Sequence, residues 1–151
     1  MIKNILVPVD GSEHSGKALA LAADIAEKYD ANLSVLFVAS HEIDGDLHHF
    51  AATEYSSEYI PKYGRVVREL SEQVARKIIN GMIKKVKSKV MISKVVLYGD
   101  PATQIVKYVA DNNFDMAIIG SRGLGTIKGV LMGSVSRKVS KLVECTCMII
   151  K

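Results

Sequence analysis

The chain has 151 residues, of which 48% are hydrophobic and 24% charged, and its formal net charge is +4. This length suits one domain with a full core, and the composition excludes a disordered or fibrous chain. No apolar stretch approaches the ~18 residues that a membrane span needs, and the start MIKNILVPVDGS lacks the long apolar core of a signal peptide. We therefore expect one cytoplasmic domain over residues 1–151, with no membrane partner.

The first part of the chain predicts a strand, a helix and a second strand. Residues Lys3–Val9 and Asn32–Ala39 are apolar and rich in β-branched side chains, which is typical of buried strands. Apolar residues recur at helical spacing between them, and Ser12 or Ser15 is a candidate N-cap. A helix of this length spans the crossover that makes two strands parallel.

Residues 40–61 show no clear period and predict a long loop, a kind of segment that often serves function. From Lys62 to Ser88, apolar residues then repeat every three or four positions and predict a long amphipathic helix. The remaining predicted elements alternate in type: a strand at Lys94–Gly99, a helix at Pro101–Asn112 capped by Asp100, a strand at Phe114–Gly120, a helix at Ser134–Leu142 and a strand at Cys145–Lys151.

Alternating strands and helices predict an open, mostly parallel α/β sheet with helices on both faces, as in Rossmann-like folds. Such sheets bind ligands beyond the carboxyl ends of their strands, where the strand order reverses. Two cysteines, Cys145 and Cys147, fall on one face of the last strand, where a disulfide between them would be strained. Buried free thiols in a reducing compartment are expected instead.

The charge is unevenly distributed along the chain. Up to Ile60 there are ten acidic and three basic residues, whereas the remainder has six acidic and seventeen basic residues. This imbalance favours an anionic partner, either a nucleic acid or a small phosphate compound. The basic long helix has no interleaved aromatic residues, so its charges are expected to be solvated and no nucleic-acid partner is predicted. The neighbouring His48 and His49 lack further ligands at metal-binding spacing.

Five glycines lie within the fourteen residues Gly120–Gly133, between the fourth predicted strand and the last helix. The first amides of that helix have no partners within the helix, and its positive end favours a phosphate. The loop is not a P-loop, because Thr126 and Ile127 follow Gly125 where Lys-[Ser/Thr] is required. The first strand-to-helix turn, VDGSEHSG, likewise lacks the dinucleotide fingerprint. From these residues alone, a glycine loop without a ligand stays an alternative.

The spacing Gly120-x2-Gly123-x9-Gly133-Ser134 resembles the G-x2-G-x9-G-[ST] pattern of ATP-binding universal stress proteins. ILVPVDGSEHS at residues 5–15 and GDPATQIVKYV at residues 99–109 are also similar to that family, so the resemblance covers the whole chain. One departure is Thr146, which follows Cys145 where the family often has proline.

The resemblance implies a five-stranded sheet of order 3-2-1-4-5 that binds ATP or a related adenine nucleotide. The implied base and ribose contacts are Pro8, Val9, Asp10, Val38 and Gly120. The implied phosphate contacts are Gly123, Gly133, Ser134, Val135 and Ser136, with Mg²⁺ held mainly by the phosphates and by water. An alternative for Asp10 is to cap the first helix.

Side chains near the phosphate loop also bear on the expected site. Arg122, Lys128 and Arg137 are close enough in sequence to neutralise phosphates, but solvated charge is expected for each. A branched residue at Gly123 or Gly133 is expected to crowd the phosphates and to strain the backbone.

These features favour an ATP-binding regulatory protein of the stress response, with no catalytic residue assigned. A slow ATPase or phosphotransferase at the same site is the alternative, although no base for hydrolysis is evident. A pure interaction dimer with an empty cleft is a third possibility, which the intact glycine pattern disfavours. The last strand lies at a sheet edge and is apolar, which together with the resemblance predicts a homodimer through that strand. A downstream protein partner is also expected.

Overall fold

The computed structural model describes residues 1–39, 60–125 and 131–151, and only the backbone of residues 60–64. The predicted loop through residues 40–59, with His48 and His49, lies outside the described residues, as does Lys128. Five strands form the sheet: β1 (Asn4–Pro8), β2 (Asn32–Ala39), β3 (Ile92–Tyr98), β4 (Met116–Gly120) and β5 (Thr146–Ile150). The described helices are α1 (Glu13–Tyr29), α3 (Ile60–Ile83), α4 (Pro101–Asp111) and α5 (Ser134–Leu142).

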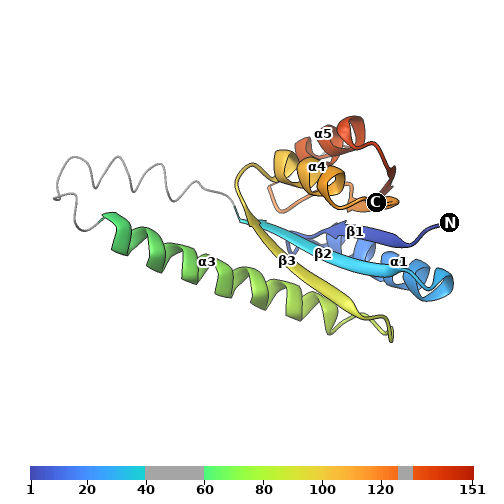
Figure 1. Ribbon diagram of the computed structural model, residues 1–151, viewed down its shortest axis with the longest axis horizontal. Coiled ribbons are helices and arrows are strands. Elements are labelled where there is room, and N and C mark those ends of the chain that lie inside the picture. The colour runs from blue at the N-terminus through green and yellow to red at the C-terminus, as the bar shows by residue number, and fades with distance from the viewer. Residues whose placement is uncertain (40–59, 126–130) are drawn as a thin grey trace.

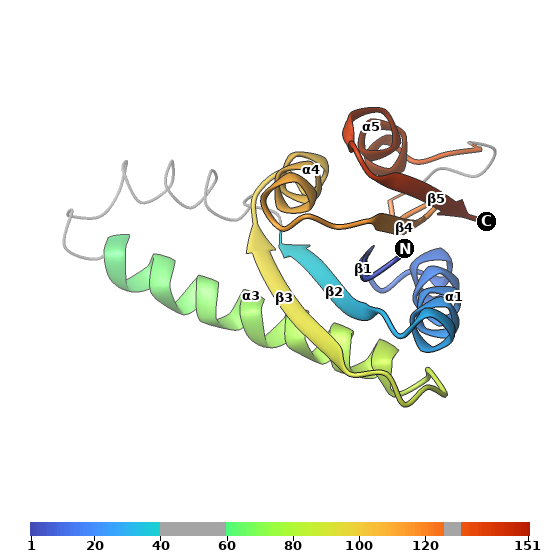
Figure 2. The same ribbon diagram turned by 45° about the vertical axis from the view of Figure 1, so that its right-hand side comes forward.

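All strand pairs are parallel, and the strand order is β3-β2-β1-β4-β5, which confirms the predicted fold class. Figures 1 and 2 show α1 and α3 on one face of the sheet and α4 and α5 on the other. Two layers of buried apolar side chains separate these helices from the sheet. In the sheet, β2 pairs with one edge of β1 and β4 pairs with its other edge. The strand order therefore reverses at β1, and the carboxyl ends of β1 and β4 flank this point.

Both predicted helix caps are present. Ser12, rather than Ser15, caps α1, because its hydroxyl accepts a hydrogen bond from the Ser15 amide at 3.2 Å. Asp100 caps α4 by accepting from the Thr103 amide at 2.8 Å, with Pro101 in the first turn. These caps fix where the chain leaves β1 and β3, and hence what lies at the carboxyl edge of the sheet.

The long helix is shorter at its carboxyl end than its sequence pattern predicts. α3 ends at Ile83 instead of Ser88, and the amides of Lys85 and Val86 donate to carbonyls only three residues earlier. Val86 still packs against the core from the segment that leads into β3. Val86 therefore falls on the apolar repeat of the helix although it lies beyond the end of α3, and this is why the sequence pattern predicts a longer helix.

The two cysteines are free thiols, as the sequence predicts, but they are half-buried rather than buried. Cys145 and Cys147 both pack against the layer on the α4 and α5 side, and burial raises the pKa of each thiol above its ordinary value. A raised pKa disfavours the thiolate, which is the reactive form of cysteine. No helix in the described part of the chain is long and apolar enough to cross a membrane.

Candidate functional site

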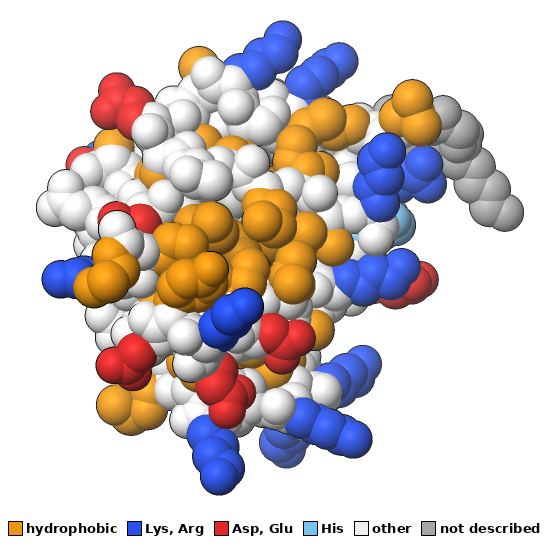
Figure 3. All heavy atoms as spheres, turned by 90° about the vertical axis from the view of Figure 1, so that its right-hand side faces the viewer, with side chains coloured by type: hydrophobic (Ala, Val, Ile, Leu, Met, Phe, Trp, Pro, Cys, Tyr) orange, Lys and Arg blue, Asp and Glu red, His pale blue; other side chains and the backbone are white. Residues whose placement is uncertain are grey.

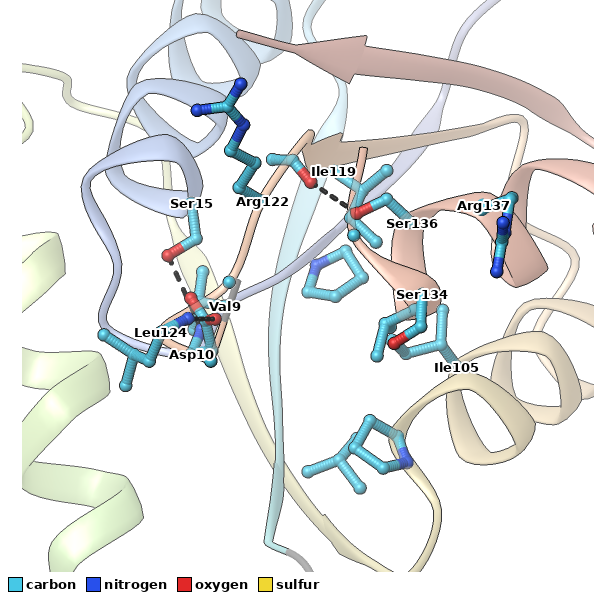
Figure 4. A pocket seen from close by; sticks show the side chains of 18 of the residues that line it. Val9, Asp10, Ser15, Ile105, Ile119, Arg122, Leu124, Ser134, Ser136 and Arg137 are labelled. Carbon is cyan, nitrogen blue, oxygen red and sulfur yellow. Dashed lines mark hydrogen bonds between the residues drawn. The ribbon is translucent and has the colours of Figure 1, made fainter. Parts of the chain in front are cut away.

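A cavity of about 900 Å³ opens at the carboxyl ends of β1, β2 and β4, between the glycine loop and the start of α5 (Figure 4). Its walls come from five separate stretches of the chain, which meet only because the parallel strands end at one edge. Every residue that the resemblance implies lines this one cavity: Pro8, Val9, Asp10, Val38, Gly120, Gly123, Gly133, Ser134, Val135 and Ser136.

Asp10 lies two residues beyond the end of β1 and is held by the loops around it. Its Oδ1 accepts a hydrogen bond from the Ser12 amide at 3.0 Å. Its Oδ2 accepts one from the Leu124 amide at 3.1 Å (Figure 4). Since Ser12 caps α1, Asp10 is not the cap of that helix. Together with the side chains of Ser12 and Ser15, these amides hold the carboxylate in place at the cavity wall.

The surroundings of Asp10 keep its carboxyl group ionised. Burial acts to raise the pKa, but hydrogen bonds from Ser12, Ser15 and the Leu124 amide outweigh it and hold the pKa below the ordinary value of 3.8. A lowered folded-state pKa contributes stability that is complete above the ordinary value and is lost as the pH falls through the folded-state value.

Asp10→Asn should therefore flatten the acid limb of the stability curve, because the variant has no carboxylate to protonate at this position. The parent should lose stability below about pH 4 more steeply than the variant does. Urea unfolding midpoints measured from pH 6 to pH 3 test this. Parallel acid limbs for the two proteins would show that Asp10 titrates alike in the folded and unfolded states.

Two glycines of the loop are required by close packing. A Cβ at Gly120 would lie 2.7 Å from the His14 carbonyl carbon and 2.7 Å from the Ser15 amide nitrogen, both backbone atoms at the start of α1. A Cβ at Gly123 would lie 2.5 Å from Oδ2 of Asp10. Gly120 thus lets β4 approach α1, and Gly123 lets the loop approach the carboxylate. By contrast, a Cβ at Gly125 would have no atom within 4 Å.

The expectation of strained backbone at Gly123 and Gly133 is wrong. Among the described glycines, only Gly11 and Gly99 have positive φ. Gly133 has φ −69° and ψ 158°, an extended conformation that any residue adopts. The reason for glycine at these two loop positions is therefore not a left-handed backbone.

The start of α5 offers unpaired amides to the cavity. Gly133 is the N-cap, and having no side chain it makes no capping hydrogen bond to the first turn. The hydroxyl of exposed Ser134 lies at the cavity wall, whereas Ser136 is buried and its hydroxyl donates to the Gly120 carbonyl at 2.7 Å. Ser136 therefore ties α5 to β4 through its side chain, and of these two serines Ser134 is the one whose hydroxyl could donate to an anion.

The cavity also has an apolar side that the sequence analysis missed in part. Phe37, Pro101 and Ile105 line it together with the predicted Val9 and Val38. An apolar wall beside a fixed carboxylate suits a flat heterocycle that carries polar groups on its edge. The predicted strand order offered one signal for these residues, since it places the end of β3, and hence Pro101, beside the end of β2.

Two arginines border the cavity. Arg122 and Arg137 both line it, and Figure 4 shows them on opposite sides, with Arg122 beside α1 and Arg137 on α5. Arg137 is exposed, as predicted, but Nε of Arg122 is buried. Within the described part of the chain, no group of three or more His, Cys, Asp or Glu side chains is placed to hold a metal ion.

The fold and site define a class: a parallel α/β protein with a glycine-rich loop and a cavity at the point where its strand order reverses. The family model described as the universal stress protein family matches residues 1–151. The chain belongs to the universal stress protein family. The universal stress protein YxiE of Bacillus subtilis is 28% identical over 153 residues, with all of both chains covered.

Solved structures show the same fold. The hypothetical protein MJ0577 superposes with a TM-score of 0.78 at 24% identity, covering 100% of this chain and 96% of that chain. A universal stress protein in complex with cAMP has a TM-score of 0.63 at 22% identity, covering 99% and 96%. A family protein from Arabidopsis thaliana with AMP bound has a TM-score of 0.60 at 20% identity, covering 99% and 91%.

Proposed function

We propose that this protein binds ATP or a related adenine nucleotide in the cavity at the carboxyl edge of the sheet and acts as a nucleotide-responsive regulator. The main support for the proposal is that three kinds of ligand-binding group line one cavity. These are an ionised carboxylate at Asp10, an apolar wall along Val9 and Val38, and open helix amides at Ser134. They match, respectively, the edge groups, the ring and the phosphates of an adenine nucleotide.

The donor set suits a phosphate group. The first turn of α5 presents backbone amides without a capping side chain, and glycine at position 123 leaves the loop close to the Asp10 carboxylate. Amides with a helix dipole behind them bind phosphate oxygens without a protein cation. Mg²⁺ would be held by the phosphates and by water, because it keeps several waters when bound. Two solved structures of family members, one in complex with cAMP and one with AMP bound, support the same ligand class.

Mass spectrometry of small molecules released from the purified protein tests the proposal directly. We expect an adenine nucleotide at a substantial fraction of the protein concentration. Titration calorimetry of the emptied protein with ATP, with and without Mg²⁺, then gives the affinity. Guanosine triphosphate is the matched control, because it carries the same phosphates on a different base. Failure of emptied, folded protein to bind any adenine nucleotide would overturn the proposal.

The same protein is proposed to be a homodimer through β5. This strand is at the edge of the sheet, and its apolar residues Cys147–Ile150 are only half-buried. Figure 3 shows apolar side chains gathered in the centre of the face on that side of the molecule. An edge strand with apolar side chains and free backbone groups pairs readily with a second copy.

Met148→Lys combined with Ile150→Lys should convert the dimer to a monomer. The two new charges would face their symmetry mates across the strand pair, where like charges are destabilising. Size-exclusion chromatography with light scattering measures the mass, and circular dichroism checks that the fold is kept. Lys141→Glu, a charge change on the exposed side of α5, is the control. A doubly substituted protein of unchanged dimer mass would place the interface elsewhere.

A further inference from the structure

Arg122 carries a buried polar atom that the proposed binding of adenine nucleotide does not yet use. The residue lies between Gly120 and Gly123 in the loop, and it lines the cavity. Its Nε is buried and has no hydrogen-bond partner among the described residues. A guanidinium group is charged at every physiological pH and has five N–H donors, so each buried donor requires an acceptor.

The backbone of Arg122 is held by a hydrogen bond, whereas its Nε has none within the described part of the chain. The Arg122 carbonyl accepts a hydrogen bond from Oγ of Ser12 at 3.3 Å, which ties the residue to the cap of α1. Asp10, the acid nearest to it along the cavity wall, already accepts the Ser12 and Leu124 amides. No described acidic side chain forms an ion pair with Arg122. Leaving its present position would therefore give up no hydrogen bond at Nε.

The position of Arg122 at the cavity wall favours an anionic ligand as the hydrogen-bond acceptor for its Nε. Figure 4 shows the Arg122 side chain beside α1, with Ser134 and Arg137 across the cavity. The amides at the start of α5 are enough for one phosphate group. A longer phosphate chain adds negative charge next to the loop that bears Arg122, and a planar guanidinium pairs with phosphate oxygens through two hydrogen bonds.

We propose that Arg122 binds the terminal phosphates of the nucleotide and makes the site prefer a nucleoside triphosphate over a monophosphate. This inference rests on the proposed nucleotide binding. It adds the residue that distinguishes a triphosphate from a monophosphate. When a triphosphate binds, the Nε of Arg122, which is buried and unpaired in this structure, donates a hydrogen bond to a phosphate oxygen. A monophosphate leaves Arg122 where it is in the present structure.

Titration calorimetry with AMP, ADP and ATP on the parent and on Arg122→Gln tests the proposal. The variant should lose about 10- to 100-fold in affinity for ATP, the range for a hydrogen bond to a charged group, and less than about 3-fold for AMP. ADP should fall between them. Arg122→Lys keeps the charge but not the paired donors, so it should recover only part of the affinity for ATP.

Arg76→Gln is the matched control, because it removes the same charge from an exposed ion pair with Glu72 on α3. It should leave all three affinities unchanged. Equal losses of AMP and ATP affinity in Arg122→Gln would show that Arg122 only supports the loop, and unchanged affinities would show no role. Either result would overturn the inference while leaving nucleotide binding in place. A parent protein that binds none of the three nucleotides would overturn the proposed function itself.

Discussion

Gly123→Val is expected to weaken ATP binding by about 100-fold or more. The new Cβ would lie 2.5 Å from Oδ2 of Asp10, so either the carboxylate or the loop must move. Moving either one separates Asp10 from the Leu124 amide and pushes a branched side chain into the cavity. Overpacking and a lost hydrogen bond to a charged group each have typical values of 1–3 kcal/mol, and about 2.8 kcal/mol corresponds to 100-fold.

Gly125→Val provides a control within the same loop. Its Cβ would meet no atom within 4 Å, and the residue also borders the cavity. Titration calorimetry on both variants, after circular dichroism has shown that they are folded, should find near-parental affinity for Gly125→Val alone. A folded Gly123→Val protein that binds ATP like the parent would mean that the loop does not form the phosphate site. Gly133→Val is less decisive, since φ −69° and ψ 158° suit any residue.

Gly120→Ala is expected to lower the free energy of unfolding by about 1–3 kcal/mol, a typical value for overpacking. The added Cβ would lie 2.7 Å from two backbone atoms of α1, and backbone cannot move aside as a flexible side chain does. The start of α1 must then move away from β4. For a chain of this size, each kcal/mol lowers the thermal midpoint by about 2–4 °C.

Gly16→Ala is the matched control, because it adds the same methyl group within α1 where no atom lies within 4 Å. Alanine favours the helix by about 0.5–1 kcal/mol over glycine, so this variant should be slightly more stable than the parent. Differential scanning calorimetry on the parent and both variants measures the two shifts. Equal thermal midpoints for Gly120→Ala and the parent would show that α1 can move away from β4 without a loss of stability.

The sequence alone determined the parts of this protein that depend on local pattern. Apolar β-branched runs predict the strands. Asp100 marks the start of α4, and Ser12 or Ser15 marks the start of α1, because such side chains bond to amides only a few residues ahead. The alternation of strands and helices predicts the parallel sheet. The spacing of Gly120, Gly123 and Gly133 likewise indicates the loop beside the start of α5. Each of these signals lies within a short stretch of chain.

Only the tertiary structure shows which residues of different elements come into contact. Phe37 and Ile105 share a wall because β2 and α4 meet at one edge, and nothing in their sequence positions states that distance. Gly120 must be glycine because α1 crosses it, and the Ser136 hydroxyl is taken by the Gly120 carbonyl rather than offered to a ligand. These contacts join residues far apart in the chain, and packing between distant segments leaves no period or motif in the sequence of either one.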